Sequence, residues 1–60
     1  MIISDDVIKI IETFPEKAKK ISYLFYVEKK TFEEIAKELN ISKGTAESVI
    51  YKYRKLLNLF

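Results

Sequence analysis

The last third of the chain has an excess of positive charge and contains hydroxyl side chains. Residues 43–60 carry four basic side chains and a single acidic one, Glu47, whereas residues 1–42 carry seven basic and eight acidic side chains. The whole chain has a net charge of only +2, but its last third has a local excess of +3. Ammonium groups, hydroxyl groups and the backbone N–H groups of a helix start all bind phosphate oxygens. This distribution indicates an anionic partner for the C-terminal helix.

The sequence lacks the residues on which most catalytic and metal sites depend. It contains no His and no Cys, so neither an imidazole nor a thiolate is available as a base or a metal ligand. The adjacent carboxylates Glu33 and Glu34 have the composition of a general acid–base pair, but they fall in the first turn of a predicted helix, where carboxylates complement the helix dipole. No nucleophile–base pair and no Gly-rich phosphate loop is present. We therefore expect no enzyme, no metal and no cofactor.

The chain has 60 residues and 7.1 kDa, which predicts a single domain over residues 1–60. A domain of this size buries only about 60% of the surface that its unfolded chain exposes, so it depends on helix packing or on a partner subunit. The longest uncharged apolar run, residues 21–27, is far shorter than the roughly 18 residues of a membrane span, and no signal peptide opens the chain. We expect no membrane contact and a cytoplasmic location.

Four helices are predicted, which makes the fold class all-α. The first has Ser4 as its N-cap, carries its apolar face as far as Phe14 and ends at Pro15. Pro15 also starts the second helix, because the missing N–H of proline costs nothing in a first turn. An alternative interpretation makes residues 21–27 a strand, since they are rich in β-branched and aromatic side chains, but no second strand-like run is available to pair with it.

The third and fourth helices have the clearest boundaries. Thr31 and Glu34 form the pattern of a capping box, and Asn40 suits the left-handed backbone at which the third helix ends. Ile41 turns inward, and Ser42 caps the fourth helix, whose apolar positions recur every 3.6 residues. Two helices joined by a turn of about three residues predict a helix-turn-helix, with a small residue, Ala36, where the helices approach each other.

Residues 15–57 resemble region 4 of bacterial sigma factors and the related LuxR-type DNA-binding domains. The resemblance rests on the sequence TFEEIAKELNISKGTAES at residues 31–48, followed by YRKL at residues 53–56. The chain departs from the family pattern at Ala46, where Val is usual, and at Glu47, where a basic residue is frequent. The polymerase-binding regions of a full sigma factor are not in this sequence. The resemblance implies a sigma-4-like, four-helix DNA-binding domain that acts as a free-standing regulator.

The exposed face of the fourth helix, over residues 43–57, is the predicted DNA-binding site, because the N-terminal end of such a helix enters the major groove. Lys43 can reach guanine edges or a phosphate, and Ser48 can bond several bases. Glu47 can accept a hydrogen bond from a cytosine amine, or it can simply face solvent. Ser42 caps the helix and can also bind a phosphate, and a close approach of DNA would explain Gly44. The predicted DNA-binding residues are Ser42, Lys43, Gly44, Thr45, Glu47, Ser48, Tyr51, Lys52 and Lys55.

The apolar ends of the chain predict a homodimer. Residues 1–3 and 56–60 are almost entirely apolar, which exceeds what a core of this size readily buries. The alternative is that Leu59 and Phe60 fold back onto the first helix. The leading hypothesis is therefore a dimeric regulator that binds double-stranded DNA. The second hypothesis is a module that binds RNA polymerase or another transcription factor through its apolar surface.

Overall fold

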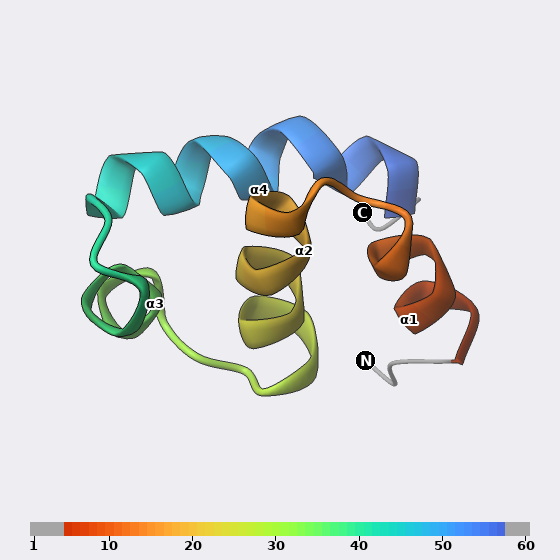
Figure 1. Cartoon of the computed structure of the whole chain (residues 1–60), viewed down its shortest axis with the longest axis horizontal. Helices are drawn as coiled ribbons and strands as arrows, with labels where there is room; N and C mark the ends of the chain where they lie inside the picture. Colours follow the sequence, from red (N-terminus) through yellow and green to blue (C-terminus); the bar gives the residue numbers. More distant parts are fainter. Residues whose placement is uncertain (1–4, 58–60) are drawn as a thin grey trace.

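The computed structural model describes residues 5–57, which form helices joined by short turns (Figure 1). The π-helix η1 continues α2 without a break, so the two together make the second of the four predicted helices. The all-α fold class is confirmed. In chain order the elements are α1 (Asp5–Glu12), α2 (Glu16–Ser22), η1 (Tyr23–Val27), α3 (Phe32–Leu39) and α4 (Lys43–Leu57).

Residues 21–27 are helical, so the alternative that they form a strand is wrong. No strand exists anywhere in residues 5–57, and an isolated strand would leave its backbone N–H and C=O groups without partners. In the π-helix η1 the hydrogen bonds span five residues, and they pair the backbone groups of this segment instead. The Glu28 N–H donates to the Tyr23 carbonyl over 3.2 Å, and the Lys30 N–H donates to the Leu24 carbonyl over 3.0 Å.

The first helix ends earlier than the sequence predicts. α1 stops at Glu12, and both the N–H and the Oγ1 of Thr13 donate to the Ile10 carbonyl, at 3.0 and 2.6 Å. Pro15 disfavours helical backbone in the residue before it, so the chain turns at Thr13 and Phe14. Phe14 is nevertheless buried, so its side chain belongs to the core although its backbone lies in the turn after α1. The predicted N-cap Ser4 lies outside the described residues.

The capping box at the start of α3 is confirmed. The Glu34 N–H donates to Thr31 Oγ1 over 3.1 Å, and the Thr31 N–H donates to Glu34 Oε1 over 2.8 Å. These two bonds satisfy N–H groups that a helix start otherwise leaves unpaired. The Thr31 N–H also holds the pKa of the Glu34 carboxyl below its usual range. Glu34 therefore has a structural role, as its first-turn position predicts.

Replacing Thr31 by alanine should lower the free energy of unfolding by about 1 kcal/mol at pH 7, because one side-chain cap is lost. Chemical denaturation monitored by circular dichroism measures this change. The lowered pKa of Glu34 favours the charged carboxylate in the folded chain, so its contribution is complete above the usual pKa of glutamate and disappears as the pH falls through the lowered value. The difference between wild type and a Glu34→Gln variant should therefore shrink in acid, because that substitution removes the carboxylate, whereas Thr31→Ala keeps the backbone N–H that lowers the pKa of Glu34. A Glu33→Gln control, which leaves the box intact, should show neither effect.

The turn between α3 and α4 has the predicted form. Asn40 adopts the left-handed conformation, with φ of 57°, and the Ile41 N–H donates to the Ala36 carbonyl over 2.9 Å. Ser42 then caps α4, since its Oγ accepts the Thr45 N–H over 3.1 Å. Ala36 is half-buried, and the fully buried residue of α3 is its neighbour Ile35.

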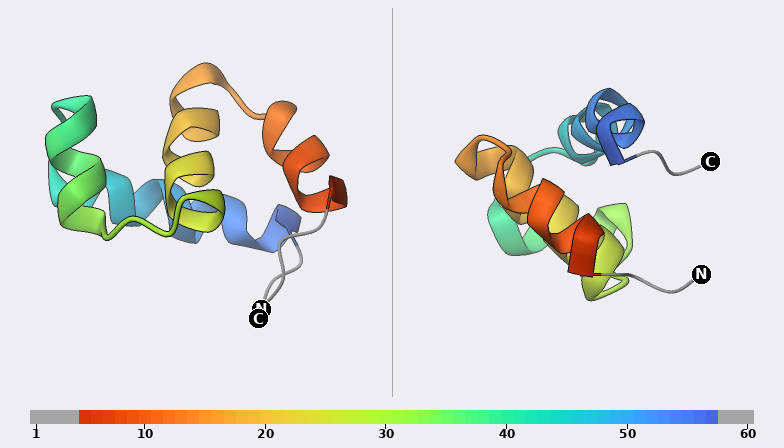
Figure 2. Two further views of the ribbon diagram at one scale, coloured as in Figure 1. Left: turned by 90° about the horizontal axis from the view of Figure 1, so that it is seen from below. Right: turned by 90° about the vertical axis from the view of Figure 1, so that its right-hand side faces the viewer.

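Two apolar clusters fill the interior, and α4 contributes to both. Figure 2 shows α2 between α1 and α3, with α4 running across all three. Ser22 is fully buried in α2, and its hydroxyl has no hydrogen-bond partner in the described part of the chain. The first cluster joins α2, η1, α3 and α4 through Ile21, Leu24, Ile35, Ala46 and Ile50. The second joins α1, the following turn, α2 and α4 through Ile11, Phe14, Ala18 and Leu57.

Candidate nucleic-acid interface

α4 presents one continuous exposed face. Its buried side is marked by Ala46 and Ile50, which are 0% and 5% exposed. Residues that follow one another at intervals of four, three and four share a face of a helix. On the side of α4 away from the core, this spacing aligns four exposed residues: Gly44, Ser48, Tyr51 and Lys55. We call these four residues the central line of α4.

The other predicted DNA-binding residues of α4 lie on the two flanks of the central line. Lys43 and Glu47 are four residues apart on one flank, and Thr45 and Lys52 are seven apart on the other. Lys43 and Lys52 are exposed, whereas Glu47 and Thr45 are half-buried. Glu47 is thus less accessible than its predicted place on the exposed face implies, because it lies on the edge of that face rather than on the central line.

The start of α4 is organised by two hydroxyl groups. Ser42 Oγ accepts the Thr45 N–H and lies 2.7 Å from Thr45 Oγ1. Ser42 thus has the capping role that the sequence predicts, and its hydroxyl remains on an exposed residue. The N–H groups of a first helical turn have no partner inside the helix and attract anions. Both hydroxyls therefore stand at a position suited to a phosphate.

Gly44 has no structural reason to be glycine. It lies in the first turn of α4 without a positive φ, and a Cβ built on it would meet no atom within 4 Å. Glycine in a helix is less favourable than alanine by up to about 1 kcal/mol. Neither the backbone nor the packing of residues 5–57 requires this cost. The remaining explanation for the glycine is a requirement from outside the chain, such as the close approach of a binding partner.

Two tyrosines of α4 face in different directions. Tyr53 is half-buried and packs against Phe14, with ring centroids 4.6 Å apart. Tyr51 is 63% exposed, and the Arg54 guanidinium lies 5.6 Å from the centre of its ring. This contact holds a large aromatic side chain on the surface beside a positive charge. Tyr51 is therefore available to a partner, whereas Tyr53 serves packing.

Lys30, the second of the two lysines that precede α3, is engaged locally. Lys30 Nζ lies 3.1 Å from Glu38 Oε1, and this hydrogen bond raises the pKa of the Lys30 ammonium group. Lys29 adopts a left-handed backbone, with φ of 58°, at the exit from η1. The ammonium group of Lys30 is therefore already paired with a carboxylate.

Packing brings two lysines of α2 to the helix-turn-helix. Lys17 and Lys20 line a depression of about 390 Å³ together with Leu39 and Ile41, the residues on either side of Asn40. The sequence shows these lysines as part of a basic stretch in the second helix, with a solvated face as the plainer interpretation. No local pattern indicates their position beside the turn, because that position depends on how α2 and α3 both pack against α4.

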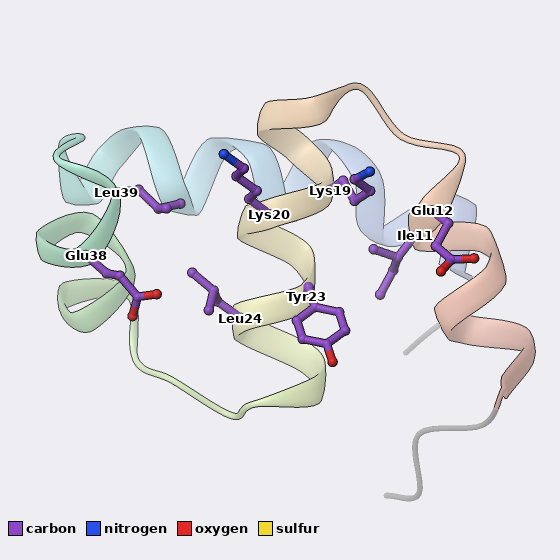
Figure 3. Close-up of a pocket in the computed structure, with 8 residues that line it drawn as sticks. All are labelled: Ile11, Glu12, Lys19, Lys20, Tyr23, Leu24, Glu38 and Leu39. Atoms are coloured by element: carbon purple, nitrogen blue, oxygen red, sulfur yellow. The ribbon is translucent and has the colours of Figure 1, made fainter.

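A second depression, of about 490 Å³, crosses α2 between α1 and α3, with α4 behind it (Figure 3). Its apolar surface comes from Ile11, Leu24 and Leu39. Tyr23, which is 42% exposed, adds an aromatic ring beside them. Charged side chains of both signs form the rest of the lining: Glu12, Lys19, Lys20 and Glu38. We call this depression the α2 groove.

The described residues hold no group of three or more acidic, His or Cys side chains arranged for a metal ion. Within residues 5–57, none of the helices is both long enough and apolar enough to span a bilayer.

Comparison with known protein families identifies a matching family. The family described as "Sigma-70, region 4" matches residues 4–57, which is most of the chain. No curated protein and no solved structure matches it.

Proposed function

Because the chain belongs to the sigma-70 region 4 family, we propose that it is a sequence-specific regulator of transcription that inserts α4 into the major groove of double-stranded DNA. The domain of this family is a non-catalytic, helix-turn-helix DNA-binding module typical of sigma factors. The cytoplasm, where such a regulator meets DNA, is its proposed location. One observation carries the proposal: the central line of α4 is exposed along its whole length, opposite a buried face.

The roles of the predicted side chains follow from their places on α4 and at its N-cap. Ser48, in the middle of the central line, reads base edges, and Lys55 binds a phosphate farther along the groove. Tyr51 offers its ring or hydroxyl between them. On the flanks of the central line, Lys43 and Lys52 bind a guanine edge or the phosphate backbone of the DNA. Ser42 and Thr45 hold a phosphate at the helix start. Glu47 accepts a hydrogen bond from a cytosine amine if its half-buried carboxylate reaches the base edge.

We also propose that the regulator is a homodimer on a two-fold operator. Leu56 is 60% exposed near the end of α4, next to Leu57, which is buried in the second apolar cluster. The remaining apolar residues at the two ends of the chain, Met1, Ile2, Ile3, Leu59 and Phe60, lie outside the described residues. A symmetric dimer would place two copies of α4 in major grooves about one helical turn apart.

Selection of bound duplexes from a random DNA pool, at near-physiological salt, tests specificity and symmetry together. Enrichment of a two-fold motif with half-sites about one turn apart supports a dimeric regulator. An asymmetric motif supports a DNA-binding monomer and contradicts the dimer. Absence of any enriched motif contradicts the proposal of sequence-specific binding.

Replacing Lys43 by alanine should weaken binding to the selected duplex and reduce its salt dependence. One lost phosphate contact lowers the slope of log affinity against log salt by about 0.9. Fluorescence anisotropy at several salt concentrations measures both quantities. If Lys43 instead bonds a guanine edge, the slope should change less and discrimination between bases should fall by about 1–3 kcal/mol at one position. An unchanged affinity and slope would remove Lys43 from the interface.

The α2 groove favours a second candidate function, which is binding to RNA polymerase or another transcription factor. An apolar depression with charged margins, on the side of α2 away from α4, is suited to an amphipathic segment of another protein. Retention of purified polymerase on the immobilised protein, together with weak and unspecific DNA binding, would favour this function. Loss of retention in a Tyr23→Ser variant that circular dichroism shows to be folded would assign it to the groove, because Tyr23 is exposed there and not part of the core.

A further inference from the structure

We infer that Arg54 fixes the ring of Tyr51 on the exposed side of α4, so that the ring contacts the methyl group of a thymine in the major groove. The inference rests on the proposed function, because it requires α4 in that groove. It makes Tyr51 a residue that determines base specificity. Arg54 is then a positioning residue, which acts through the Tyr51 ring rather than by its own contact with the DNA.

Side-chain length increases along the central line of α4. The line begins with Gly44 and Ser48, continues with Tyr51 and ends with Lys55. Figure 1 shows α4 as one continuous helix, whereas the floor of the major groove winds around the DNA axis. A straight helix that enters the groove by its N-terminal end therefore moves away from the bases farther along its length. Tyr51 is the first residue of the line whose side chain is long enough to span this growing distance.

The contact between Tyr51 and Arg54 joins neighbouring turns of α4. The two residues are three apart, so their side chains meet on the helix surface. The Arg54 guanidinium lies over the Tyr51 ring, 5.6 Å from its centre, which is within the range of a cation–π interaction. Tyr51 nevertheless remains 63% exposed. The guanidinium thus covers one face of the ring and leaves the rest of the ring open to a partner.

The surroundings of Arg54 favour this contact. Arg54 forms no ion pair with any carboxylate of residues 5–57. Its charge also acts on Tyr26 of η1, since burial raises the pKa of the Tyr26 hydroxyl and the Arg54 charge partly offsets that increase. Tyr26 is half-buried and packs against both apolar clusters. Arg54 therefore lies between the exposed Tyr51 ring and the body of the domain.

A ring that is held in one orientation suits a small apolar group on the DNA. The ordering of a side chain during binding opposes association, and the contact with Arg54 provides this order in the free protein. In the major groove, the apolar group that distinguishes thymine from the other DNA bases is its C5 methyl group. Burial of this methyl group against the Tyr51 ring favours binding through the hydrophobic effect. Thymine is thus the base that the ring recognises.

Removal of single methyl groups from the DNA tests the inference. Fluorescence anisotropy compares the affinity of the full chain for the selected duplex with its affinity for duplexes in which one thymine is replaced by deoxyuridine. We call the ratio of these two affinities the methyl effect. It is measured for wild type, Tyr51→Ala, Arg54→Gln, Arg54→Lys and the double variant Tyr51→Ala with Arg54→Gln. Circular dichroism verifies that every variant is folded.

Lys52→Gln is the matched control. Lys52 is the cation beside the other tyrosine of α4, with its Nζ 5.8 Å from the centre of the Tyr53 ring. Its replacement removes one charge from α4 and leaves Tyr51 and Arg54 in place. It should therefore weaken binding to all duplexes and keep the full methyl effect.

At one or more thymines, the wild type should show a methyl effect of about three- to fivefold, the value for one buried methyl group. The effect should vanish in Tyr51→Ala and fall below about twofold in Arg54→Gln, and the double variant should equal Tyr51→Ala. Arg54→Lys keeps the charge without the planar guanidinium. It should therefore retain the wild-type affinity for an unrelated duplex and lose part of the methyl effect.

Two results would overturn the inference and leave the proposed function intact. One is a methyl effect that is unchanged in Arg54→Gln. The other is the absence of any methyl effect in a wild-type protein that binds the selected duplex. A wild-type protein that binds no duplex would overturn both the inference and the proposed function.

Discussion

Replacing Ile35 by alanine should leave most of the protein unfolded at 25 °C. Ile35 is 0% exposed and lies in the first apolar cluster, where α3 meets α4. Truncation of a buried isoleucine to alanine costs about 2–5 kcal/mol, because contacts are lost and a cavity remains. A domain of this size has a total stability of only about 3–5 kcal/mol. The loss is therefore comparable to the whole free energy of unfolding.

Circular dichroism and urea denaturation measure this effect, and Leu56→Ala is the control. Leu56 is 60% exposed, so its truncation should change the stability of the monomer by less than about 0.5 kcal/mol. An Ile35→Val variant, which removes a single methyl group, should fall between them at about 0.5–1.5 kcal/mol. A cooperative transition of Ile35→Ala near that of the wild type would mean that the α3–α4 contact contributes little to the fold.

Replacing Gly44 should move stability and DNA binding in opposite directions. Gly44→Ala should raise the free energy of unfolding by up to about 1 kcal/mol, because alanine is the better helix former and its Cβ meets no atom within 4 Å. Gly44→Leu should also be tolerated by the free protein. Position 44 lies on the central line of α4, however, so each side-chain carbon added there would hold α4 farther from the floor of the major groove. We expect binding to fall modestly for alanine and by at least tenfold for leucine, or about 1.4 kcal/mol.

Thermal unfolding and anisotropy titrations on the same samples separate the two effects. The graded pair is its own control, since both variants gain helix propensity and only the size of the side chain differs. Equal affinity of wild type, Gly44→Ala and Gly44→Leu for the selected duplex would show that DNA does not approach this backbone. A loss of stability in Gly44→Ala would show that the free protein itself requires the glycine.

Signals that depend on neighbouring residues were predicted correctly. Thr31 and Glu34 form the capping box, Asn40 ends α3 in the left-handed conformation, and Ser42 caps α4. Each of these features joins groups no more than about four residues apart, so the local sequence contains both partners. The division into four helices and the helix-turn-helix follow from the same short-range patterns.

Features that depend on competition between local and distant contacts were predicted less well. Phe14 belongs to the helical apolar pattern of residues 7–14, yet it lies in a turn and still reaches the core. The second half of the second helix is a π-helix, which no periodicity in residues 21–27 indicates. Ser22 is a polar residue in that stretch, and its complete burial comes from the helices that pack around it.

The sequence by itself determined the helices, their caps, the family and the candidate face of α4, because 3.6-residue periodicity and capping act within one or two turns of the chain. Only the tertiary structure decided which side chains of that face are fully exposed. It showed that Glu47 is half-buried and that Leu57, rather than Leu56, enters the core. It also placed Lys17 and Lys20 beside the turn. The physical reason is the same in each case: the angle at which helices pack is set by apolar contacts between residues far apart in the chain, and no local pattern encodes it.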